Sequence, residues 1–141
     1  MDLSGTIGGS RYLKRLNQAV TSTEWPGTIL PADTWVEALS LTGKHLIDMV
    51  VARNETSSSI CYAKYEIDGV MSAEREIRNN LSMLLIGLGS PPAVGSNANN
   101  LVDVPQYAKA SFKVFVKRTP SGTAGMTFSA RYSQVSVEPM E

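Results

Sequence analysis

The chain has 141 residues, of which 43% are hydrophobic, and its 13 basic and 13 acidic residues give a formal net charge of zero. This length favours one domain over residues 1–141, and the apolar content suffices for a core, which excludes global disorder. The neutral total excludes binding of nucleic acid through bulk positive charge, so any such binding requires basic residues gathered on one surface.

The N-terminal residues 1–33 are rich in Gly, Pro, Ser and Thr around a short basic piece, R-Y-L-K-R-L-N. This composition predicts an N-terminal hairpin or arm with loose connections. The segment lacks the basic and apolar regions of a secretory signal, and the longest apolar run is far too short to span a bilayer. We therefore expect a non-secreted chain without a membrane partner.

Three segments with strand-like patterns follow, at residues 34–42, 46–53 and 60–67. Residues 34–42 alternate between two sets of side chains, as the two faces of a strand require. The other two segments are joined by the polar loop N-E-T-S-S-S. This arrangement predicts a β-hairpin.

Residues 72–89 carry the pattern of an amphipathic helix. Ser72 is a favourable N-cap, and glycines at the far end are followed by Pro91 and Pro92. The apolar residues that fall on one helix face are Ile77, Leu81, Leu84, Leu85 and Leu88. We predict an α+β fold, an antiparallel sheet with this one principal helix. The apolar stripe is wide enough to serve as a dimer interface, and a core helix within a monomer explains it equally well.

Residues 108–137 read as a C-terminal basic β-hairpin. Between Lys109 and Arg131 there are five Lys or Arg and no Asp or Glu. One face is apolar, and the other carries the candidate nucleic-acid-binding residues Lys109, Ser111, Lys113, Lys117, Thr127, Ser129 and Arg131. Such a face suits phosphates, because Lys and Arg neutralise charge while hydroxyls hydrogen-bond oxygens. An ordinary solvated sheet face gives the same pattern.

The sequence offers no catalytic constellation. His45 is the only histidine and Cys61 the only cysteine, and no acidic cluster has metal-ligand spacing. We therefore expect no enzyme activity, no metal, no cofactor and no small-molecule substrate.

Residues 5–25, from G-T-I-G-G-S to T-E-W, and residues 62–85, from Y-A-K-Y to M-L-L, carry a resemblance to one family. They resemble the coat proteins of single-stranded RNA bacteriophages (levivirus-like). Residues 5–25, G-T-I-G-G-S-R-Y-L-K-R-L-N-Q-A-V-T-S-T-E-W, resemble the N-terminal hairpin of some of these coats. Residues 62–85, in which a Tyr-containing strand leads to Ser, acids, an Arg and an apolar pattern, look like their junction between sheet and helix. The roughly fifty residues after Gly89 depart from the family, whose coats end soon after the helices.

The resemblance implies a homodimer with one continuous sheet, helices lying across the partner's sheet, and an opposite face that contacts genomic RNA. It also implies assembly in the host cytoplasm and a place in the virion. The leading hypothesis is thus a capsid subunit that self-assembles and packages RNA. Two alternatives are a small nucleic-acid-binding module that uses the basic hairpin, and a phage tail or decoration protein without nucleic-acid contact.

Overall fold

The computed structural model describes residues 11–25, 31, 33–54, 60–78, 82–87, 103–119 and 126–139. Every regular element in these residues is a β-strand. In chain order the strands are β1 (Arg11–Trp25), β2 (Val36–Thr42), β3 (His45–Asn54), β4 (Cys61–Ile67), β5 (Val70–Met71), β6 (Arg75–Ile77), β7 (Ser82–Ile86), β8 (Gln106–Ala108), β9 (Ser111–Arg118) and β10 (Met126–Pro139).

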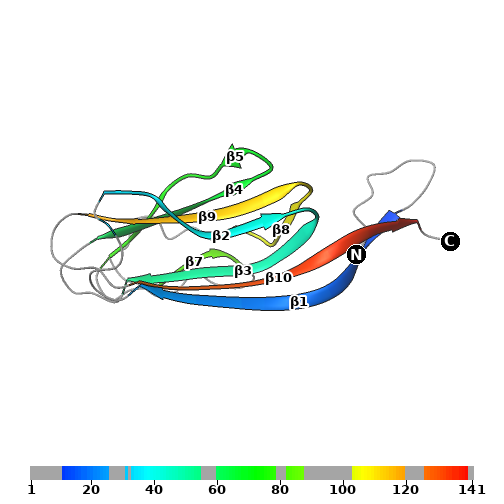
Figure 1. The fold of residues 1–141 in the computed structure, drawn as a ribbon, viewed down its shortest axis with the longest axis horizontal. Helices are drawn as coiled ribbons and strands as arrows, with labels where there is room; N and C mark the ends of the chain where they lie inside the picture. The colour runs from blue at the N-terminus through cyan, green and yellow to red at the C-terminus, as the bar shows by residue number, and fades with distance from the viewer. Residues whose placement is uncertain are drawn as a thin grey trace.

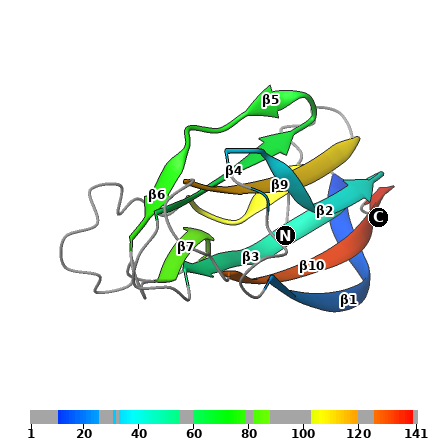
Figure 2. The same cartoon turned by 60° about the vertical axis from the view of Figure 1, so that its left-hand side comes forward.

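The strands form two antiparallel sheets that lie one above the other (Figures 1 and 2). Sheet A has the order β1-β10-β3, and β7 and β8 both pair with the free side of β3 at different positions along it. Sheet B has the order β2-β9-β4, and β5 and β6 both pair with the free side of β4. Each of these two pairs therefore acts as one interrupted edge strand.

The order in which the chain visits the sheets is that of a jelly roll. With each interrupted pair taken as one strand, the ten strands reduce to eight, four in each sheet. The chain then crosses between the sheets at every connection except the one from β4 into β5. Two packed sheets of four antiparallel strands, in which every pair of neighbours except β4 and β5 is distant in sequence, define the jelly-roll architecture.

The core lies between the two sheets and follows from the period-two pattern of the strands. In β9, Phe112, Val114 and Val116 are buried, and in β10 Phe128 and Ala130 are buried. A smaller apolar cluster, made by Leu13, Leu46, Tyr107, Val135 and Val137, joins β1, β3, β8 and β10. The long β1–β10 ribbon curves past the end of the sandwich (Figure 1).

A two-residue turn, Asp68-Gly69, joins β4 to β5. Both residues have positive φ, 50° and 87°, which is the type I′ geometry that suits the twist of a hairpin. The Asp68 carboxylate also accepts hydrogen bonds from the backbone N–H groups of Lys109, Ala110 and Ser111 at 2.7–3.0 Å. The turn at the edge of sheet B is thereby attached to the connection between β8 in sheet A and β9 in sheet B.

The predicted helix over residues 72–89, and with it the α+β fold class, is wrong. Within the described part of this segment the chain forms β6 and β7, which pair with β4 and β3. The apolar run that suggested a helix face is a strand whose Met83, Leu85 and Ile86 are fully buried. The helix that the phage-coat resemblance implies is therefore absent from the described residues.

The strands predicted at residues 34–42, 46–53 and 60–67 are confirmed as β2, β3 and β4. The two predicted hairpins are wrong, because β3 lies in sheet A and β4 in sheet B, and β10 lies in sheet A and β9 in sheet B. Of the predicted N-terminal hairpin, residues 11–25 form one strand, β1, and residues 1–10 and 26–30 lie outside the described residues.

Candidate nucleic-acid interface

The outer face of sheet B carries alternate lysines and aromatic side chains. In β9, Lys113, Phe115 and Lys117 point away from the core, because the residues between them are buried. In β4 the same alternation places Tyr62 and Lys64 on the outer face. The strand register sets Tyr62 opposite Lys117, and Lys64 opposite Phe115.

Trp35, just before β2, completes this surface. The Lys64 Nζ lies 4.1 Å from the centroid of the Trp35 ring, and the Lys117 Nζ lies 4.7 Å from it. Lys117 is also 5.3 Å from the Tyr62 ring. We name this surface the lysine–aromatic patch; its members are Trp35, Tyr62, Lys64, Phe115 and Lys117.

The patch combines two groups that single-stranded nucleic acid recognises. An ammonium group held over a ring keeps its positive charge and its capacity to contact phosphate. Half-buried rings offer faces on which bases stack, an interaction that tolerates any sequence. The arrangement can therefore bind a nucleic-acid strand through its backbone and its bases together.

Acidic residues reduce the positive charge across this face, because the strand register places Glu37 opposite Phe115 and Glu76 opposite Tyr62. The strand register places Glu66 opposite Lys113, at the end of β9 nearer to Ser111. Lys109 and Ser111 lie at the start of β9, where their backbone N–H groups are bonded to the Asp68 carboxylate. Their neighbour there is thus an anion, which weakens attraction to phosphate.

The structure divides the seven residues predicted to bind nucleic acid between two opposite surfaces. Lys109, Ser111, Lys113 and Lys117 belong to β9 and to the turn before it, in sheet B. Thr127, Ser129 and Arg131 belong to β10 and lie on the outer face of sheet A. They alternate with Met126, Phe128 and Ala130, which are buried in the core. The predicted set therefore does not form one continuous face.

Arg131 lies instead in a cavity of about 390 Å³ on sheet A, whose lining also includes Arg15, Asp48 and Leu84. Arg15 makes a two-pronged ion pair with Asp48, with N–O distances of 2.7 and 2.8 Å, and donates a further hydrogen bond to Ser133. The Asp48 carboxylate raises the pKa of Arg15. These contacts join β1 to β3 and β10, and both Arg15 and Arg131 are exposed to solvent.

The predicted dimer-interface residues also separate. Ile77 and Leu85 are fully buried in the core of a single chain, whereas Leu84 lines the cavity on sheet A. Leu81 and Leu88 lie outside the described residues.

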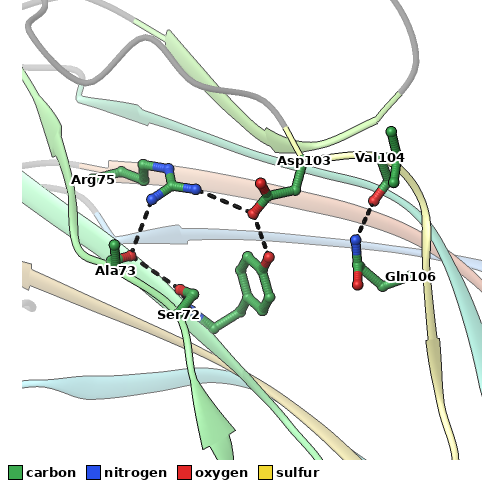
Figure 3. A network of polar contacts seen from close by, with 7 residues as sticks. Ser72, Ala73, Arg75, Asp103, Val104 and Gln106 are labelled. Atoms are coloured by element: carbon green, nitrogen blue, oxygen red, sulfur yellow. Dashed lines mark hydrogen bonds and ion pairs between the residues drawn. The ribbon is translucent and has the colours of Figure 1, made fainter.

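A polar network clamps the edge where β6 and β7 face each other (Figure 3). The buried Arg75 donates to Asp103 at 3.1 Å, and the Tyr65 hydroxyl donates to the same carboxylate oxygen. Burial first, and then this hydrogen bond, raise the pKa of Tyr65. The backbone of Asp103 bonds to Leu85 and Gly87, so the network links sheet B to β7 of sheet A. Its charged groups are paired with one another, which makes it a structural clamp.

Sequence reasoning missed Trp35, Tyr62 and Lys64 as candidate binding residues. The available signal was the alternation Y-A-K-Y in residues 62–65, which places Tyr62 and Lys64 on one face of a strand. In the part of the chain that the structure describes, no three His, Cys, Asp or Glu residues gather as metal ligands. Nor does that part contain a helix long and apolar enough to cross a membrane.

Comparison with known proteins gives no family. No protein-family model matches the chain, and no curated protein matches it. Solved structures of infectious bursal disease virus are similar at a low level. The Gx strain structure shows 12% identity and a TM-score of 0.30, over 96% of this chain and 37% of that one.

Two further structures of the same virus match at a similar level. The Gt strain structure shows 11% identity and a TM-score of 0.26, over 95% of this chain and 38% of that one. The VP2 subviral particle structure shows 10% identity and a TM-score of 0.29, over 94% of this chain and 39% of that one. The chain thus spans less than two fifths of the chains it matches. The jelly-roll assignment rests on the strand order of this chain alone.

Proposed function

We propose that this chain is a structural subunit of a virus shell, built from copies of the chain, that packages RNA. The observation that carries the proposal is the jelly-roll strand order, which viral capsid domains share with lectins and cupins. Because one fold serves several functions, the surface of the molecule has to favour one of them.

Two surface features favour a subunit that binds its own copies and RNA. The edge strands of both sheets leave backbone groups open to a neighbour, and exposed apolar side chains lie beside them. The lysine–aromatic patch supplies an RNA contact that reads no sequence. In this proposal the chain assembles in the host cytoplasm and resides in the virion.

A second candidate function is a nucleic-acid-binding module that forms no shell. The same lysine–aromatic patch favours it, because stacking and phosphate contacts do not depend on assembly. Both candidates predict binding that is broad in sequence and weakened by salt. They differ in whether closed particles form.

The deciding experiment is expression of the chain alone, followed by size-exclusion chromatography and negative-stain electron microscopy. Closed particles whose absorbance ratio at 260 and 280 nm reports nucleic acid would support the shell. A small species that shifts an RNA probe in a salt-dependent way would support the binding module and contradict the shell.

Matched double variants test the face assigned to RNA. The double variant Lys64→Gln with Lys117→Gln removes both ammonium groups of the patch. The double variant Thr127→Ala with Arg131→Ala changes two residues on the outer face of the opposite sheet. We expect the first variant to lose packaged RNA and the second to retain it. The reverse result would assign RNA to sheet A and contradict the role of the patch.

A further inference from the structure

Exposed large apolar side chains gather at two opposite edges of the sandwich. Among the described residues there are four of them, Leu16, Val70, Met71 and Val104, with 51, 72, 43 and 66% of their surface exposed. Leu16 lies on β1, at one end of the strand order of sheet A. Val70 and Met71 form β5 at the opposite edge, and Val104 precedes β8 there.

The edge with β5 and β8 contains a slot. A cavity of about 420 Å³ is lined by Val70 and Met71 of β5, by Gln106 of β8, and by Tyr65 and Ile67 of β4. Gln106 donates to the Val104 carbonyl at 2.6 Å, which places Val104 beside the same opening (Figure 3). The slot therefore has apolar walls and lies between the edges of the two sheets.

The opposite edge presents a knob. The register between β1 and β10 shifts between Arg15 and Asn17, so Leu16 is the extra residue of a β-bulge. A bulge turns a side chain away from the regular alternation and is common where a strand edge meets something else. Leu16 is thus held out from the sheet by backbone geometry.

Charged side chains lie beside both the knob and the slot, where Lys109 acts on Asp68. Lys14 and Arg15 precede Leu16 and are exposed. At the slot stands Asp68, whose three hydrogen bonds from backbone N–H groups lower its pKa, so it is ionised at neutral pH. Arg15 is already paired with Asp48, which leaves Lys14 as the cation for Asp68.

We propose that Leu16 of one copy inserts into the slot bounded by Val70, Met71 and Gln106 of the next copy, with Lys14 facing Asp68. This contact rests on the proposed function, since it supplies one of the contacts from which a shell is built. It joins two different surfaces, so every copy keeps one free knob and one free slot. A contact of this type continues into rings or open chains and does not stop at a dimer.

Cysteine pairs test the contact directly. Leu16→Cys and Val70→Cys are expressed separately, mixed under the conditions of assembly and oxidised, and disulfide-linked dimers are counted on non-reducing gels. We expect links in the mixture and few in either variant alone, because each variant offers only one half of the contact. The unmodified chain controls for Cys61, which is buried. Thr34→Cys replaces Val70→Cys as an exposed control, because Asp33 beside it bonds to Arg118 at the far end of β9 from the slot.

The outcomes separate this contact from the shell proposal. Equal linking of Leu16→Cys with itself would show a symmetric interface and overturn the inference, as would linking with Thr34→Cys at the same rate. Closed particles that form without disulfide links between Leu16→Cys and Val70→Cys would support the shell proposal and contradict the proposed contact. Rings or filaments with those links, but no closed particles, would support the contact and contradict the shell.

Substitutions by Asp give a second measurement. Leu16→Asp and Val70→Asp each place an ionised carboxylate in the proposed contact and leave the exposed surface of the single chain otherwise unchanged. We expect each to weaken self-association by roughly tenfold or more, measured by analytical ultracentrifugation. Unchanged association in either variant would contradict the contact.

Discussion

Asp68 holds the backbone of Ala110, although 42 residues separate them: the Asp68 Oδ1 accepts the Ala110 N–H at 2.7 Å. The same carboxylate accepts from Lys109 and Ser111, and the Asp68 N–H donates to the Ser111 carbonyl. One side chain therefore satisfies three backbone donors in the β8–β9 connection. The positive φ of Asp68 also forms the β4–β5 turn. The turn and the attachment of the β8–β9 connection therefore both depend on Asp68.

We predict that Asp68→Asn lowers the free energy of unfolding by about 1 kcal/mol, because a neutral amide oxygen replaces a charged acceptor at a solvent-exposed site. Asn tolerates the left-handed backbone conformation, so the turn itself is preserved. Urea denaturation at pH 7 measures the difference. Asp33→Asn is the matched control, since Asp33 also has positive φ and, among the described residues, shows no such cluster of bonds through its side chain.

The stabilisation by Asp68 depends on pH with a definite sign. The bonds from Ala110, Lys109 and Ser111 lower the pKa of Asp68 below its ordinary value of 3.8. A lowered pKa in the folded state gives stability that is complete above 3.8 and is lost as the pH falls through the folded value. The difference between the parent chain and Asp68→Asn should therefore be constant at neutral pH and shrink below pH 3.8. A difference that grows in acid would contradict this assignment.

The Arg75–Asp103–Tyr65 clamp predicts a graded loss of stability. Asp103→Asn leaves the buried Arg75 guanidinium without its anion, and we expect a cost of about 2–3 kcal/mol because Asp103 itself is partly solvated. Tyr65→Phe removes only the hydroxyl, and its expected cost is about 1 kcal/mol. A double-mutant cycle in urea denaturation measures the coupling. Additive losses would show that the Tyr65 hydroxyl gains nothing from Asp103 and would contradict the clamp.

Leu84 and Leu85 are adjacent in sequence but lie on opposite sides of sheet A. Leu85 is fully buried between the sheets, so Leu85→Ala should cost about 2–5 kcal/mol. Leu84 lines the outer cavity and is half-buried, so Leu84→Ala should cost less than about 1.5 kcal/mol. Thermal or chemical denaturation of both variants compares them. Equal losses would be expected of a helix buried on all sides and would contradict the strand.

The period-two patterns at residues 34–42, 46–53 and 60–67 predicted strands correctly. Apolar and polar side chains alternate along each of these segments for long enough to identify the buried face. The helix was predicted wrongly because Ile77, Leu81, Leu84, Leu85 and Leu88 fit a helical spacing, and no local feature opposed it. Pairing of β7 with β3 decides the conformation of that segment, and this is a long-range contact that periodicity does not contain. The dipeptide Asp68-Gly69 is a typical hairpin signal, but no strand was predicted after it at the position of β5.

The candidate site was predictable only in part for a similar reason. Alternation correctly assigned Lys113 and Lys117 to the outward side of their strand, and Arg131 to the outward side of its own. It could not assign the strands to sheets. A connection between two strands can close a hairpin or cross to the other sheet, and the sequence of residues 119–125 suits both. Trp35 enters the patch by packing across strands, which no spacing in the sequence reports.

The thiol of Cys61 should be inert in the folded chain. Cys61 is fully buried in β4, and burial raises the pKa of its thiol to about 12. Since the thiolate is the reactive form, both burial and the raised pKa suppress reaction at neutral pH. We expect a thiol reagent to modify Cys61 only as fast as the sandwich opens, with fast reaction in urea. Rapid stoichiometric labelling of the native chain would show that the Cys61 thiol is accessible and would contradict its burial between the sheets. The unmodified chain would then no longer serve as an unreactive control in the cysteine cross-linking experiment.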